Sequence, residues 1–124
     1  MVPLDIHRSY YWYHGAADMR KSFDGLAGLV TGQMQESLLS GAVFIFMNRK
    51  RNQVKLLTWE GDGLSIYYKR LEKGVYDLPV VKNTAQRSVQ MNAFQLQLML
   101  QGVVLSSVRL KKRFSLPLAA PTPL

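Results

Sequence analysis

Residues 43–59 constrain the fold of this chain more than any other part of the sequence. They form two apolar runs, residues 43–47 and 54–59, joined by the polar segment 48–53. Both runs are rich in β-branched and aromatic residues, and a short polar link between two such runs predicts a β-hairpin. The link carries three consecutive cations, Arg49, Lys50 and Arg51. The hairpin would therefore present a rigid, positively charged tip.

A second tight turn extends this hairpin into a meander. Gly61 and Gly63 permit positive φ angles, and residues 64–68 form a third strand-like run after them. Beyond a charged turn, residues 75–78 are expected to add a short fourth strand. The weakly alternating segment 86–90 is expected to form an edge strand.

Two segments show helical spacing. In the first, Asp18 is placed to accept hydrogen bonds from the free amides at the start of a helix. The apolar residues that follow it at helical spacing are Phe23, Leu26, Leu29 and Val30. In the second, Asn92 is placed to cap a helix over residues 93–101, and Gly102 is placed to end it.

These elements predict one α+β domain over residues 1–114, an antiparallel β-meander of four or more strands with two helices packed on it. The aromatic run 10–13, ended by Gly15, suits a further strand. Residues 115–124 contain three prolines and no charge, so they are expected to form a disordered tail.

The charge balance favours an anionic partner. The 124 residues include 16 Lys+Arg and 8 Asp+Glu, which gives a formal net charge of +8. Such a surface attracts polyanions, nucleic acid first among them. There are no cysteines, which excludes disulfides and thiolate metal sites. The sequence has neither a signal-peptide pattern nor a long apolar span, so we expect a cytoplasmic protein without membrane contact.

Catalysis has little support in the sequence. A metal-dependent nuclease needs about three converging carboxylates. The candidates are Asp18, Asp24, Glu60, Asp62 and Glu72, and each also fits a helix cap, a turn residue or a solvated partner of a nearby lysine. His7 and His14 lack the spacing of a zinc site. The glycine pairs lack the residues of a phosphate-binding loop. We therefore expect no catalytic residues, no metal and no cofactor.

Basic residues interleaved with tyrosines carry the main functional prediction. In a meander, the tip of the first hairpin and the end of the third strand lie at the same edge of the sheet, because the second strand runs away from that tip and the third returns. Cations there would pair with phosphates, and a tyrosine could stack on an unpaired base. The predicted nucleic-acid-binding residues are Arg20, Lys21, Arg49, Lys50, Arg51, Lys55, Tyr68, Lys69 and Arg70. The alternative for each single residue is a solvated turn or core position.

Four ordered blocks of the sequence resemble a known family. The blocks cover residues 13–26, 40–51, 55–63 and 68–74. In order and spacing they are similar to the accessory protein encoded by the second reading frame of insertion-sequence-sixty-six-type transposable elements. That protein is often labelled TnpB, but it is not the RNA-guided nuclease of the same label. The chain departs from the family pattern at Ala17, Ser22 and Met47, and none of these changes removes a charged residue of the blocks.

The resemblance implies a bacterial protein that is encoded beside a larger transposase and needed for efficient transposition, with the carboxylate chemistry attributed to that transposase. It carries over no catalytic residue, only the motif positions Met19-Arg20-Lys21, Asn48-Arg49 and Lys69-Arg70. We expect a non-catalytic accessory protein that binds DNA, or the DNA–transposase complex, through a basic face. The alternative is an interaction module that docks the transposase without touching DNA.

Overall fold

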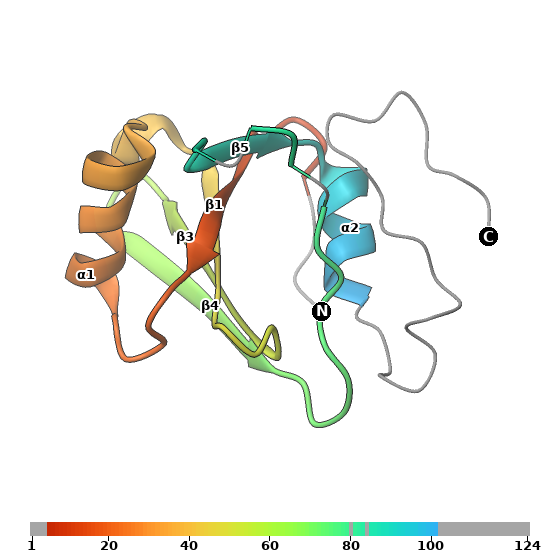
Figure 1. Ribbon diagram of the computed structural model, residues 1–124. Coiled ribbons are helices and arrows are strands. Elements are labelled where there is room, and N and C mark those ends of the chain that lie inside the picture. The colour runs from red at the N-terminus through yellow and green to blue at the C-terminus, as the bar shows by residue number, and fades with distance from the viewer. Residues whose placement is uncertain (1–4, 80, 84, 102–124) are drawn as a thin grey trace.

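A computed structural model describes residues 5–79, 81–83 and 85–101 and shows a five-stranded sheet with helices on both faces (Figure 1). The strands are β1 (Tyr10–Ala16), β2 (Val43–Met47), β3 (Gln53–Trp59), β4 (Leu64–Arg70) and β5 (Ser88–Met91). They lie in the order β4-β3-β2-β1-β5. The meander β2-β3-β4 is antiparallel as predicted, and β5 pairs antiparallel with β1. Because β1 pairs parallel with β2, the sheet is mixed, and the predicted α+β class is confirmed.

The helices connect the strands and cover the sheet. The first helix is α1 (Phe23–Gly28), which continues into the π-helical segment η1 (Leu29–Met34). A short 3-10 turn, η2 (Leu38–Ser40), then leads into β2. The second helix, α2 (Ala93–Gln101), follows β5 directly. In Figure 1, α1 and α2 lie on opposite sides of the sheet.

Two apolar cores account for this arrangement, one on each face of the sheet. Successive strand residues point to opposite faces, so a strand covered on both sides must be apolar throughout. Every residue of β2 is buried. The core under α1 includes Phe44, Phe46, Leu26 and Val30, and the core under α2 includes Ile45, Met47, Leu96 and Met99. The continuous apolar run that predicted a strand therefore marks the centre of the sheet.

The start of α2 confirms the predicted cap. The Asn92 side-chain oxygen accepts from the Gln95 backbone N–H at 2.8 Å, and the Gln95 side-chain oxygen accepts from the Asn92 N–H at 2.9 Å. This reciprocal capping box satisfies two backbone donors that the helix itself leaves free. The predicted stop at Gly102 and the predicted tail 115–124 lie outside the described residues.

Three local predictions need correction. The first helix begins at Phe23 rather than near Asp18, and its N-cap residue, Ser22, makes no side-chain capping bond. No strand forms over residues 75–78, where only Val75 makes an isolated bridge. Strand β1 does not end at Gly15 but runs on to Ala16 with a shift in its register against β2, since Gly15 adopts φ +152°. At the first place, hydrogen bonds from Arg20 and Lys21 to Asp18 form a turn before the helix. At the second, the Tyr76 N–H donates to the Arg51 carbonyl at 2.7 Å instead of joining a strand ladder.

Candidate nucleic-acid interface

The loop between β2 and β3 is held in shape by the side chain of Asn48. Its oxygen accepts from the backbone N–H groups of Asn52 and Gln53, both at 3.0 Å, and its amide nitrogen donates to the Asn52 side chain at 2.6 Å. The Arg51 N–H also donates to the Asn48 carbonyl at 3.1 Å and closes a β-turn. The loop therefore presents its cations from a fixed frame.

Arg51 occupies an unusual backbone conformation at this loop. Its φ is 60°, in the left-handed region where a residue with a Cβ is disfavoured by about 1 kcal/mol. Glycine or asparagine is the usual choice for such a position. Arg49 and Lys50 are exposed, whereas Arg51 is half-buried. The chain thus keeps an arginine where the backbone alone would favour glycine.

The strand register brings the second basic cluster to the same place. Gln53, the first residue of β3 after the loop, pairs with Arg70, and the next two pairs of β3 with β4 bring in Lys69 and Tyr68. These three β4 side chains are exposed. The predicted convergence of the loop with the end of the third strand is therefore present in the fold. Because strand side chains alternate, Tyr68 and Arg70 face the α1 side and Lys69 faces the α2 side.

Lys55 has a different role from its predicted neighbours. It is only 7% exposed, and its ammonium donates to the backbone carbonyls of Met19 at 2.9 Å and Lys21 at 2.7 Å. The same ammonium lies 4.6 Å from the centre of the Tyr68 ring, a cation–π distance. Lys55 therefore fastens the turn after β1 onto the sheet, and its buried ammonium is not available to an external anion.

The turn that Lys55 fastens supplies two further cations. Lys21 is exposed, and its backbone N–H donates to the Asp18 carbonyl at 3.0 Å. Arg20 is also exposed, but its guanidinium is paired with the Asp18 carboxylate, with Nη2 to Oδ2 at 2.7 Å. The hydrogen bonds from the Arg20 side chain and backbone N–H lower the pKa of Asp18 to about 2. Asp18 thus shapes this turn, and Arg20 offers less free charge than Lys21.

Three loops meet at one end of the sheet, which we call the basic end: residues 17–22, 48–52 and 71–74. They lie together at the lower end of the sheet in Figure 1. Backbone hydrogen bonds link them, from Ala17 N–H to Met47 O at 2.8 Å and from Leu71 N–H to Asn52 O at 2.7 Å. The opposite end of the meander carries the acidic turn with Glu60 and Asp62. Charge is therefore segregated along the strands.

The same placement separates the carboxylates that a metal site would need. Asp18 and Glu72 belong to the basic end, where each is already paired with an arginine, and Asp62 belongs to the opposite end. No group of three or more histidine or acidic side chains that could hold a metal ion occurs within residues 5–79, 81–83 and 85–101.

Within that same part of the chain, no helix has the length and apolarity to span a bilayer.

No sequence pattern predicts two contacts that lie beside the basic end. Arg87, which precedes β5, donates from its guanidinium to the His14 carbonyl at 2.9 Å, so its charge lies beside the end of β1. The His14 ring in turn donates through Nδ1 to the Gln86 carbonyl at 2.9 Å. Both contacts join segments more than 70 positions apart in the chain. These contacts form because β1 pairs with β5, which brings His14 beside Gln86 and Arg87.

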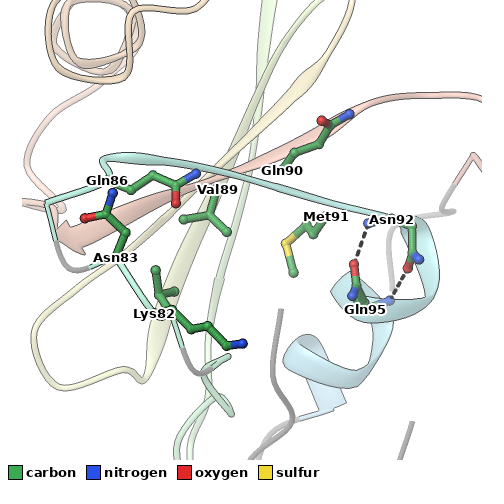
Figure 2. Close-up of a pocket in the computed structure, with 9 residues that line it drawn as sticks. Lys82, Asn83, Gln86, Val89, Gln90, Met91, Asn92 and Gln95 are labelled. Atoms are coloured by element: carbon green, nitrogen blue, oxygen red, sulfur yellow. Dashed lines mark hydrogen bonds between the residues drawn. The ribbon is translucent and has the colours of Figure 1, made fainter. Parts of the chain in front are cut away.

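A pocket of about 540 Å³ lies elsewhere, where β5 meets α2 (Figure 2). Several carboxamides line it, but most are already engaged. Asn92 and Gln95 form the capping box drawn with dashed lines in Figure 2, and the Gln86 amide donates to the Ser88 carbonyl at 2.8 Å. These side chains serve the fold, so this pocket is a weaker recognition site than the basic end.

Comparison with known proteins gives a match to one family. The model of the family described as IS66 Orf2 like protein matches residues 8–110. Two similar curated proteins, both from Sinorhizobium fredii (strain NBRC 101917 / NGR234), are named as uncharacterized. Protein y4jC is 28% identical over 105 residues, covering 85% of this chain and 83% of its own length. Protein y4hO is 29% identical over 103 residues, covering 83% and 87%. No solved structure matches.

Proposed function

Because this chain belongs to the IS66 Orf2 like family, whose model matches residues 8–110, we propose that it is a transposition accessory protein that binds the DNA of its element through the basic end. Membership supports an association with transposition and with the transposase of such an element. The further step, that the partner touched by the basic end is DNA, rests on the charge and geometry of this surface.

The single observation that carries the proposal is the convergence of exposed cations from separate loops on a rigid frame. The exposed side chains are Arg20, Lys21, Arg49, Lys50, Lys69 and Arg70. The Asn48 hydrogen bonds fix one loop and the buried Lys55 ammonium fixes another. Loop backbones that are already ordered lose little further conformational entropy when DNA binds, and the net charge of +8 steers polyanions toward them. The contacts suit the phosphate backbone rather than base edges.

The proposed role is to hold DNA, or the complex of DNA with the transposase, and not to cleave it. Docking to the transposase alone is the second candidate, favoured by the exposed aromatic Phe23, which is 44% accessible and stands two residues after Lys21. An apolar ring beside a basic loop is typical of protein interfaces as well. Purification with the cognate transposase in high salt after nuclease treatment separates the two candidates, because a DNA-bridged complex falls apart under those conditions.

A salt titration tests the DNA-binding proposal. We expect binding to duplex DNA whose logarithmic affinity falls linearly with the logarithm of salt concentration. Lys50→Gln should reduce the slope by about 0.9, the value for one phosphate contact. The matched control is Arg8→Gln, which also removes one positive charge but stands before β1, at the opposite end of the sheet, beside Thr58. Equal slopes for both variants, or no binding at low salt, would contradict the proposal.

A further inference from the structure

A second pocket opens at the basic end and combines apolar and cationic walls. Its volume is about 450 Å³, and it lies between the end of β1, the loop after β2 and the segment before residue 80. Its apolar members include Trp12, Met47 and Leu78, and its cationic or titratable members are His14, Arg49 and Arg51. Trp12 and Met47 are buried, and Arg49 is exposed. Apolar side chains therefore form the inner wall, and charge surrounds the opening.

This combination of apolar and cationic walls suits one class of ligand, the nucleotides. Ligand pockets commonly have volumes of about 300 to 1,000 Å³, with apolar walls and a few polar groups that set the orientation of the ligand. No carboxylate occurs among the described residues that line this pocket. A flat, largely apolar base can lie against the half-buried His14 ring and Leu78, and a phosphate on the same nucleotide can reach the guanidinium groups at the opening.

The hydrogen bonds of His14 also suit a nucleotide in this pocket. Its Nδ1 donates to the Gln86 carbonyl, which fixes the ring and leaves Nε2 without a partner among the described residues. The ring lies 5.3 Å from that of Trp12, tilted by 38°. Because Trp12 is only 4% exposed, the half-buried His14 ring is the accessible aromatic surface of this wall, and the indole packs behind it. The left-handed backbone at Arg51 belongs to a residue of this wall, which gives a reason for keeping an arginine there.

We infer that this pocket binds one unpaired nucleotide of a DNA strand, its base against the His14 ring and its phosphate between Arg49 and Arg51. The inference rests on the proposed function, because the same DNA would run over the basic end. A base inside a duplex is stacked and paired and cannot enter the pocket. The chain would therefore prefer DNA with a strand end or a melted segment to a fully paired duplex.

The test compares three DNAs with the full chain: a short blunt duplex, the same duplex with a single-stranded overhang, and the same overhang without bases. We expect the overhang to raise affinity about 5- to 100-fold, the range for stacking one base on an aromatic side chain, and the abasic overhang to lose this gain. The indole N–H resonance of Trp12 should shift with the overhang, while that of Trp59, at the far end of β3, stays in place.

A pocket-filling variant locates the effect. Ala16 is exposed and lines the pocket, so Ala16→Leu should abolish the gain from the overhang and leave blunt-duplex affinity unchanged. Gln97→Leu, exposed on α2 outside the pocket, is the matched control. Equal affinity for all three DNAs overturns the inference while the proposed function stands. Absence of binding to any of them overturns both, and mononucleotide binding without preference for the overhang assigns the pocket to free nucleotides and also overturns it.

Discussion

Replacing Lys55 with methionine is the sharpest test of how the basic end is held together. Methionine has nearly the same length and an apolar terminus, so Lys55→Met keeps the packing and removes the charge. The change deletes the two hydrogen bonds to the carbonyls of Met19 and Lys21 and the contact with the Tyr68 ring. The turn after β1 would then lose its attachment to β3.

The expected loss follows from these contacts. Hydrogen bonds to a charged group contribute about 1.5 to 3 kcal/mol each. Removing a buried ammonium also relieves its desolvation cost, and water can reach the freed carbonyl of Lys21, which is an exposed residue. We therefore expect the free energy of unfolding to fall by about 2 kcal/mol, within the range of measured single substitutions. For a domain of this size that lowers Tm by about 10 °C.

Urea unfolding followed by circular dichroism measures the global loss, and amide exchange of residues 18–22 measures the local one. Lys69→Met is the matched control, because Lys69 is exposed on the neighbouring strand and loses the same charge. Its stability should stay within about 0.5 kcal/mol of the original. If Lys55→Met is equally stable, leaves the exchange unchanged and lowers the DNA salt slope by about 0.9, then Lys55 contacts DNA and does not hold the turn after β1.

Three further perturbations test individual contacts. The carboxyl of Asp18 should titrate in the folded protein at a pKa of about 2 rather than its ordinary 3.8, because Arg20 donates to it. The pKa of Asp18 is lower in the folded protein than in the unfolded chain, so the stability that its pairing with Arg20 contributes is complete above pH 3.8 and is lost as pH falls through 2. An NMR titration midpoint of Asp18 near 3.8 would contradict the pairing. Asn48→Ala should reduce the free energy of unfolding by about 2 kcal/mol and Asn48→Asp by less, since aspartate keeps the acceptor; equal values would show that the two backbone bonds are unimportant. Tyr76→Phe should leave that free energy unchanged or raise it by up to about 1 kcal/mol, because the buried Tyr76 hydroxyl has no partner among the described residues; a larger loss on denaturation would reveal a partner.

The sequence predicted the parts of the fold that depend on local pattern. The meander followed from three apolar runs separated by turns, and the capping box followed from Asn92 standing just before a helical pattern. It also predicted that the β2–β3 loop and the end of β4 converge, since a meander permits no other arrangement. Each of these depends on residues that are close in the chain.

Most of the remaining features depend on contacts between distant segments. The parallel pairing of β1 with β2 requires the intervening helices to cross the sheet, and neither run of residues encodes that partner. Lys55 looked like a surface cation because nothing near it in the sequence shows that the turn at residues 19–21 covers it. Asp18 carried the pattern of a helix cap, but the pairing with Arg20 formed a separate turn before the helix. Tertiary placement decided the first two cases, and a local side-chain contact decided the third.

The most direct measurement of the central claim is a map of the DNA contact surface. Backbone amide resonances of the isotope-labelled chain would be followed during titration with a short DNA duplex at low salt. We predict that shifts concentrate in residues 19–22, 48–52 and 68–71, and that the acidic turn at residues 60–63 stays unperturbed. Shifts centred on the pocket between β5 and α2, or no shifts at any DNA concentration, would contradict the proposal that the basic end binds DNA.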